Sequence, residues 1–427
     1  MDKTDKRYSA YLGILHEELM PAMGCTEPIA IAYAAAMARR ILGILPERVE
    51  IEVSENILKN VKSVIVPNTG KLKGIEAAAV AGIVVGDADK VLEVISTISE
   101  KGQKDIVNYL KTKDVKVLTA KSDLIFDLIV NVYNGESSAS VQISNYHTNI
   151  VRITKNGKMV MHNQHCDDIG MTQTTDRSIM NIKDILDFVE SVDIEEVREV
   201  LQRQIDYNTA ISKEGIENDW GANVGSTLLK AWGSDDVKVR AKAMAAAGSD
   251  ARMSGCELPV IIVSGSGNQG ITASIPVIEY AKDLKVDQET LYKALLVSNL
   301  VTIHQKTGIG RLSAYCGAVS AGVGAGAGIA WICGGRFEEV AHTIVNALAI
   351  VSGIICDGAK PSCAGKIAAA VDAGILGYYM YKNGQEFYGG DGIIQKGVEN
   401  TIKNIGRLGS VGMRETDKEI IRIMLGK

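Results

Sequence analysis

A long uncharged stretch rich in glycine and alanine constrains the fold of this chain more than any other feature. Residues 315–335 carry no charge, and their centre reads GAVSAGVGAGAGIA. The stretch approaches the length of a bilayer span, but side chains this small insert weakly into lipid. We therefore expect a buried central helix whose neighbours pack close to its backbone. The scarcity of rings, with four Phe and three Trp in 427 residues, agrees with such a core.

The composition is that of a globular protein and argues against several classes of partner. Apolar residues make up 46% of the chain, charged residues 23%, and the net charge is −5. The chain has no excess of basic residues, so binding to nucleic acid or to an anionic membrane is not expected. The polar N-terminal segment lacks the apolar run of a secretory signal, so the expected compartment is the cytoplasm. On general grounds we expect a homodimer.

The hydrophobic pattern changes along the chain and predicts an α+β fold. Residues 46–169 contain short β-rich runs separated by turns, interrupted by helical patterns at 74–85 and 88–103. This part is expected to form an α+β subdomain with a mostly antiparallel sheet. Residues 1–45 and 170–427 have helical periodicity and are expected to form a predominantly helical catalytic domain.

A glycine-rich run at 264–270, SGSGNQG, matches the letters of a dinucleotide-binding loop. That motif requires a β-α-β unit, whereas helical periodicity follows here, so we reject a nucleotide site. Backbone amides at the start of a helix can still hold a carboxylate or phosphate, although a simple turn between helices explains the run equally well. Candidate anion-binding residues in the run are Ser266, Gly267, Asn268 and Gln269.

The chain has seven cysteines, an odd number, and no disulfide framework is expected for them. Cys256 and Cys333 lie in apolar surroundings and are expected to be buried hydrophobes. Cys25, Cys316 and Cys356 instead fall at predicted helix boundaries among small residues, where a thiolate is favoured. Three such thiolates suit an iron–sulfur cluster with one iron left open as a Lewis acid. Zinc held by three thiolates and a histidine is the alternative.

Several long motifs resemble those of the L-cysteine desulfidase family, which is related to the α chain of iron–sulfur-dependent L-serine dehydratases. The resemblance covers essentially the whole chain. The motifs are GCTEP at 24–28, VPNTG at 66–70, HTNI at 147–150, SDARMSG at 249–255, SGSGNQGITA at 264–273, RLSAYCGA at 311–318 and CDGAKPSCAGK at 356–366.

This resemblance implies an oxygen-sensitive lyase that converts L-cysteine to sulfide, ammonia and pyruvate. It implies a 4Fe-4S cluster held by Cys25, Cys316 and Cys356, with Cys363 as a neighbour that competes as a ligand. The vacant iron would bind the substrate sulfur. The elimination requires no pyridoxal phosphate, and we find no convincing motif for its lysine.

A general base must stand near the substrate Cα. His147 is the first candidate, although a single histidine in a loop is more often structural, and Lys59 and Lys366 are rivals. The amino acid's carboxylate and ammonium would be held by residues of the glycine-rich run, together with Asn56, Arg252 and Glu27.

Two other functions remain open. The same cluster and elimination would serve L-serine, since the motifs do not distinguish a sulfur from an oxygen leaving group. A non-enzymatic protein that binds a small anion on the glycine-rich run is the second alternative, and it predicts inert cysteines. The colour of an iron–sulfur cluster separates this last alternative from the two enzymes.

Overall fold

The structure is a computed structural model, and it describes residues 1–122, 124–162, 175–310 and 312–426. Arg311 and Cys166 lie outside the described residues. The helices are α1 (Lys6–Glu18), α2 (Thr26–Leu42), α3 (Glu55–Val61), α4 (Gly74–Val85), η1 (Ala88–Glu93), α5 (Glu100–Thr112), α6 (Ile182–Ser191), η2 (Ile194–Glu196), α7 (Arg198–Glu217), α8 (Val224–Trp232), α9 (Val237–Met253), α10 (Gly267–Leu284), α11 (Gln288–Ile309), α12 (Gly317–Ile332), α13 (Phe337–Val351), α14 (Cys363–Lys382), α15 (Val398–Arg407), η3 (Leu408–Gly412) and α16 (Arg414–Leu425).

The strands form two sheets within the described ranges. They are β1 (Pro21–Met23), β2 (Arg48–Val53), β3 (Asp114–Thr119), β4 (Asp127–Asn134), β5 (Ser137–Ser144), β6 (Ile150–Lys155), β7 (Lys158–His162) and β8 (Pro259–Ile261). The large sheet has the order β3-β2-β4-β5-β6-β7, and only its β2–β3 pair is parallel. The second sheet is the short antiparallel pair β1–β8.

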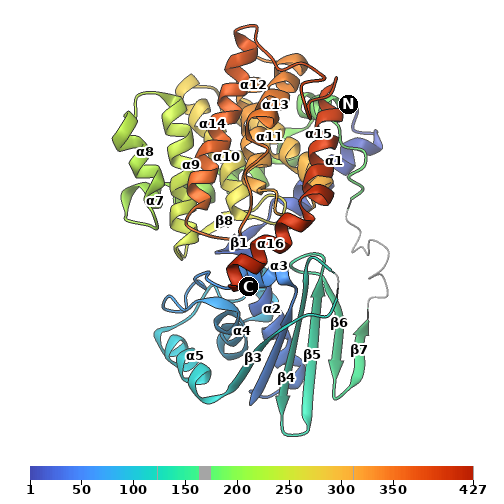
Figure 1. The fold of residues 1–427 in the computed structure, drawn as a ribbon, viewed down its shortest axis with the longest axis vertical. Coiled ribbons are helices and arrows are strands. Elements are labelled where there is room, and N and C mark those ends of the chain that lie inside the picture. The colour runs from blue at the N-terminus through green and yellow to red at the C-terminus, as the bar shows by residue number, and fades with distance from the viewer. Residues whose placement is uncertain (123, 163–174, 311, 427) are drawn as a thin grey trace.

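The large sheet lies at one end of the molecule and the helical body at the other (Figure 1). In β2 the side chains of Val49, Ile51 and Val53 alternate with more exposed ones, so one face is buried. Helices α2 and α4 pack on this sheet. The predicted α+β fold with a mostly antiparallel sheet is confirmed.

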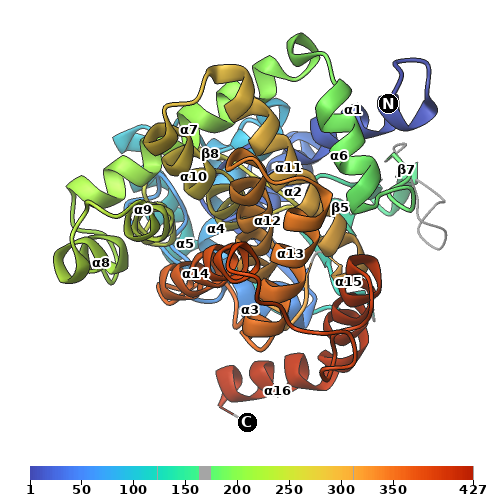
Figure 2. The same ribbon diagram turned by 90° about the horizontal axis from the view of Figure 1, so that it is seen from above.

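Helix α12 forms the centre of the helical body, surrounded by α10, α11, α13 and α14 (Figure 2). Nearly all of its residues are buried. A Cβ on Gly322 would lie 2.5 Å from the backbone of Ala370, and one on Gly326 would lie 2.7 Å from the backbone of Gly374. Glycine thus lets α12 and α14 approach backbone to backbone, as the composition predicts. Among the described residues, no helix is long and apolar enough to cross a membrane.

The prediction of one helix at residues 88–103 is wrong. Residues Ala88–Glu93 form a short 3-10 turn in which Val91 has a φ of +48°, and the α-helix begins only at Glu100. Ser99 is the N-cap of α5, because its hydroxyl accepts a hydrogen bond from the Gly102 N–H. The α-helix therefore begins at the side-chain cap and not where the apolar periodicity begins.

The buried side chains gather in two clusters. One lies in the helical body, and the other joins the sheet with α4 and α2, from Ile29 to Leu42. The division at residues 45 and 169 stays a prediction. Because α2 shares the core of the sheet, we propose that the boundary on the N-terminal side lies before this helix.

Candidate active site

Two short backbone pairings bring distant motifs together. The β1–β8 pair sets Met23 opposite Pro259, which carries the GCTEP motif to the glycine-rich turn. There the Thr26 hydroxyl donates to the Gly265 carbonyl at 2.8 Å, and the Arg252 guanidinium donates to the Gly24 carbonyl at 2.6 Å. The predicted place of Cys25 at a helix boundary is confirmed, since α2 begins directly after it.

The second pairing joins two cysteine motifs. The Cys316 N–H donates to the Ile354 carbonyl at 3.1 Å, and the Cys356 N–H donates to the Ala314 carbonyl at 2.7 Å. Cys316 immediately precedes α12, as expected. The expectation that Cys356 ends a helix is wrong, because α13 ends at Val351 and Cys356 lies in the following loop. Cys363, expected inside a helix, is instead the first residue of α14.

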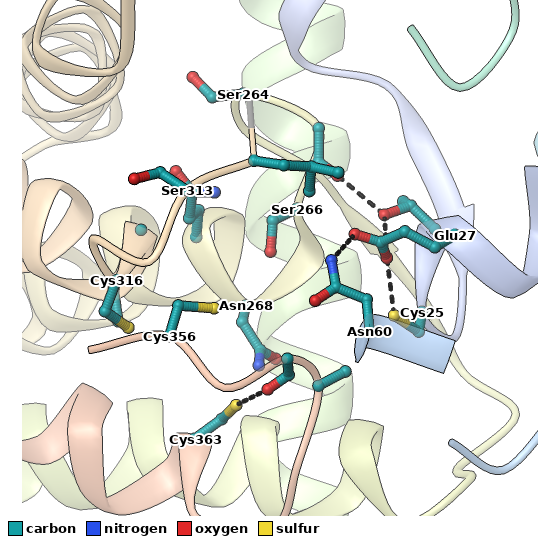
Figure 3. A pocket seen from close by; sticks show the side chains of 18 of the residues that line it. Cys25, Glu27, Asn60, Ser264, Ser266, Asn268, Ser313, Cys316, Cys356 and Cys363 are labelled. Carbon is teal, nitrogen blue, oxygen red and sulfur yellow. Dashed lines mark hydrogen bonds between the residues drawn. The ribbon is translucent and has the colours of Figure 1, made fainter. Parts of the chain in front are cut away.

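These motifs surround one cavity of about 100 Å³ (Figure 3). Among the described residues its lining includes Cys25, Thr26, Glu27, Lys59, Asn60, His147, Arg252, Ser264, Gly265, Ser266, Asn268, Gln269, Lys306, Leu312, Ser313, Tyr315, Cys316, Gly317, Ala318, Cys356, Gly358, Ala359, Cys363 and Ile367. The structure thus brings together most of the site residues predicted from the sequence. Gly267, Asn56 and Lys366 are the three predicted residues that do not line the cavity.

Four of the described helices, α2, α10, α12 and α14, begin at this cavity. None of their N-cap residues accepts a side-chain cap hydrogen bond within the described chain. The amides of a first helical turn need acceptors, and the helix dipole adds positive potential there. The cavity is therefore suited to an anionic occupant.

One side of the cavity, here called the thiol wall, consists of Cys316, Cys356 and Cys363 (Figure 3). Burial, together with the nearby Cys356 and Cys363, raises the pKa of the Cys316 thiol to about 12. Burial also raises the pKa of Cys363, with a contribution from Cys356. A metal bound at this wall would have to displace the protons of Cys316 and Cys363.

The opposite side, here called the carboxylate wall, consists of Cys25 and Glu27 (Figure 3), together with His147 beside Glu27. The Cys25 thiol donates to Glu27 Oε2 at 2.9 Å, and Asn60 Nδ2 donates to Glu27 Oε1 at 3.1 Å. His147 Nε2 stands 4.0 Å from Glu27 Oε1, an ion-pair distance too long for a hydrogen bond. His147 also packs edge-on against Phe126.

The groups of the carboxylate wall differ in their protonation. Burial opposes ionisation of Glu27, but His147, the Cys25 thiol and the backbone together hold the pKa of this carboxyl at about 2. Burial, with the neighbouring Glu27 charge, raises the pKa of Cys25 well above its usual value. At neutral pH the wall thus carries a carboxylate beside a protonated thiol.

The glycine-rich run forms a tight turn and then a helix. Ser264 and Gly265 have φ values of +48° and +78°, and Val263 and Ser266 hydrogen-bond to each other across the turn. The turn thus brings the start of α10 to the cavity, where Ser266, Asn268 and Gln269 line it. Helices α10 and α11 follow the run with no strand between or after them in the described residues, so the run does not open a β-α-β unit, as predicted.

Two buried polar side chains beside this turn have atoms without a hydrogen-bond partner among the described residues. They are Arg252, at its Nε, and Gln269, at its Oε1. Arg252 Nη1 also donates to the Asn268 side-chain oxygen at 3.1 Å. Buried polar atoms are rarely left unpaired, so these atoms indicate a place for a polar ligand.

The rival bases predicted from the sequence are engaged in ion pairs. Lys59 Nζ lies 2.5 Å from Asp417 Oδ1 and is buried. Lys366 pairs with Asp357. Nε2 of His147, by contrast, is buried without a hydrogen-bond partner in the described chain. Asn60, the residue after Lys59, contacts Glu27 and was not predicted as a site residue. The sequence indicated it only through its place in SENILKN, the segment that contains Lys59.

The donor set fits a cluster better than a single metal ion. No three His, Cys, Asp or Glu side chains of the described residues converge closely enough to hold one ion. Zinc draws its ligand atoms to within about 2.3 Å of one point. In a cluster each iron takes its own thiolate, so the ligands need only line a shared cavity. The thiol wall and the uncapped helix starts meet that requirement.

Comparison with known proteins shows the family of the chain. The chain belongs to the serine dehydratase alpha chain family, whose profile matches residues 76–422. Similar proteins are a UPF0597 protein of Desulfitobacterium hafniense, 61% identical over all of this chain and 99% of the relative, and one of Lachnoclostridium phytofermentans, 53% identical over 98% and 100%. A UPF0597 protein of Treponema denticola is 46% identical over 100% and 99%. The family is iron–sulfur dependent in general, and its chemistry is that of a lyase.

Proposed function

We propose that this chain is an iron–sulfur lyase that converts L-cysteine to sulfide, ammonia and pyruvate. The observation that carries the proposal is a single small cavity in which three thiols face a charged carboxylate and a histidine. Membership of the serine dehydratase alpha chain family supports lyase chemistry. The resemblance of the motifs to the desulfidase family supports L-cysteine as the substrate.

We propose Cys316 and Cys356, as predicted, and Cys363 as the three cluster ligands. The place of the three thiols on one side of the cavity supports this set (Figure 3). Cys25, predicted as a ligand, faces the cavity from the carboxylate wall, and its thiol donates a hydrogen bond to Glu27 Oε2. A fourth thiolate would occupy every iron of a four-iron cluster, so a separate Cys25 keeps one iron open.

When bound, the cluster supplies a Lewis acid that assists the departure of the substrate sulfur. The chain supplies the other groups. The first amides of α10, with Asn268 and Arg252, hold the substrate carboxylate, which makes the Cα proton easier to remove. His147 Nε2 accepts that proton, while the C–S bond breaks and sulfide leaves. Glu27 stabilises the resulting imidazolium and the substrate ammonium. Water then hydrolyses the released aminoacrylate to pyruvate and ammonia.

The proposal is tested by anaerobic reconstitution with iron and sulfide, followed by product analysis. We expect a brown protein that releases sulfide and pyruvate in equal amounts from L-cysteine and loses both colour and activity in air. The control is Cys256→Ser, which removes a buried thiol outside the cavity. A colourless protein after reconstitution contradicts the proposal, as does a coloured protein inactive on every β-substituted amino acid offered.

L-serine is the second candidate substrate, favoured by the description of the matching family. Pyruvate formed faster from L-serine than from L-cysteine would assign the chain to it. An anion-binding protein without activity would form no cluster and turn over neither amino acid. The cytoplasm and a homodimer stay predictions.

A further inference from the structure

The C-terminal helix α16 lies against the short helix α3, where the helical body meets the sheet (Figure 1). Asp417, in the first turn of α16, pairs with Lys59 of α3 at 2.5 Å. Lys62 adds a second contact, since its Nζ donates to the Met424 carbonyl at 3.1 Å. The side chain of Lys59 is 1% exposed and that of Asp417 is 13% exposed. The two helices are thus joined by a buried ion pair.

Helix α3 in turn contacts the loop that carries Cys356. Lys59 Nζ lies 3.4 Å from the Cys356 carbonyl oxygen, and Lys360 Nζ lies 3.4 Å from the Lys59 carbonyl oxygen. Gly358 has a φ of +91°, and a Cβ there would lie 2.8 Å from the Lys59 carbonyl oxygen. The loop and the helix backbone therefore touch without space between them, so a shift of α3 must move the loop.

The same helix reaches the opposite wall of the cavity. Asn60, next to Lys59, donates to Glu27 Oε1 at 3.1 Å. One helix of seven residues thus contacts the backbone of the thiol wall and the carboxylate of the other wall.

We propose that Lys59 and Asp417 are positioning residues, through which the C-terminal helix sets the place of Cys356 in the cavity wall. A buried ion pair is costly, and an apolar pair of similar size usually gives equal or greater stability. An apolar pair, however, has no donor for the Cys356 carbonyl. The proposal rests on the proposed function only in treating Cys356 as a cluster ligand, because the geometric claim concerns the loop itself.

The experiment compares four variants of the full chain with the parent protein. Asp417→Asn leaves a buried ammonium without its carboxylate, whereas Lys59→Met combined with Asp417→Leu removes both charges. Lys62→Met removes the contact to Met424 from an exposed position and leaves the buried pair intact. Glu419→Gln is the matched control, because it breaks an exposed ion pair with Arg422 on the same helix.

Three quantities are measured for each variant. The first is the rate at which iodoacetamide alkylates Cys356 before reconstitution, followed by peptide mass spectrometry. The second is the rate of iron loss to a chelator after reconstitution, and the third is the midpoint of thermal unfolding. We expect the double variant to unfold near the parent midpoint but to be alkylated at Cys356 about tenfold faster, the size of a typical coupling between contacting residues. Iron loss should accelerate in parallel.

Parent-like alkylation in the double variant, at an unchanged unfolding midpoint, would show that the pair only stabilises the fold. If the double variant does not fold, the test rests on Lys62→Met. We expect Lys62→Met to raise the rate of Cys356 alkylation more than Glu419→Gln does. Equal alkylation rates in these two variants would overturn the proposal. Alkylation is measured without the cluster, so it tests positioning even if no cluster forms, in which case the proposed function alone fails.

Discussion

The two walls of the cavity differ in chemistry and in origin. The thiol wall belongs to loops of the helical body, where a backbone pairing and the starts of α12 and α14 set its sulfurs. The carboxylate wall comes from the start of α2 and the loop between β5 and β6, which belong with the sheet. The proposed metal ligands and the groups proposed to exchange protons are thus separated, and a substrate bound between them would contact both. The placement of one wall relative to the other is therefore what the fold has to secure.

The largest expected effect comes from the thiol wall. Replacing Cys316, Cys356 or Cys363 singly with Ser should abolish iron binding and reduce activity to background, because each removes a proposed ligand. Iron content per chain and visible absorption check this, with Cys256→Ser as the control. If Cys363→Ser kept its iron while Cys25→Ser lost it, the ligand set predicted from the sequence would replace the one proposed from the structure.

The carboxylate wall should behave in the opposite way. His147→Gln and Glu27→Gln are expected to keep the parent iron content while kcat falls by about 10²- to 10⁴-fold, the usual contribution of acid–base groups, because His147 is the proposed base and Glu27 stabilises its imidazolium. Iron analysis and steady-state kinetics on the same samples check this. Loss of iron and activity together in either variant would remove the distinction between the walls.

A smaller effect is expected at the glycine-rich turn, which lies between the walls. Asn268→Ala should raise KM by about tenfold with little change in kcat, since it weakens binding of the carboxylate in ground and transition states alike. Asn400→Ala, at an exposed position on α15, is the control. A fall in kcat at constant KM would instead place Asn268 in the chemical step.

The smallest effect concerns stability and pH. The pKa of Glu27 in the folded chain is about 2, below its ordinary value of 4.5, so ionised Glu27 stabilises the fold above pH 4.5 and this contribution disappears as the pH falls towards 2. Glu27→Gln should therefore be less stable than the parent at pH 7, by on the order of 3 kcal/mol. The difference should shrink below pH 4.5 in denaturant titrations without the cluster. A constant difference would mean that the charge of Glu27 contributes nothing.

Local signals in the sequence were sufficient for the architecture. Period-two alternation predicted the strands from Arg48 to His162, and the run of small residues predicted α12 and its close contact with α14. The segment at 88–103 was mistaken for a helix, because its periodicity was read without the cap at Ser99. Cys25 and Cys316 were placed correctly before helices, since the break and the following helical pattern both lie within a few residues.

The sequence by itself determined the α+β fold, the family, and the motifs that meet at the cavity, because these depend on periodicity, composition and contiguous residues. Only the tertiary structure decided which cysteines face one another. Cys25 is separated from Cys316 by almost three hundred residues, and two-stranded backbone pairings bring their segments to one cavity but to opposite walls. Hydrogen bonds between such distant segments leave no periodic trace in the sequence. For the same reason the buried pair of Lys59 and Asp417 became visible only when α3 and α16 were seen in contact.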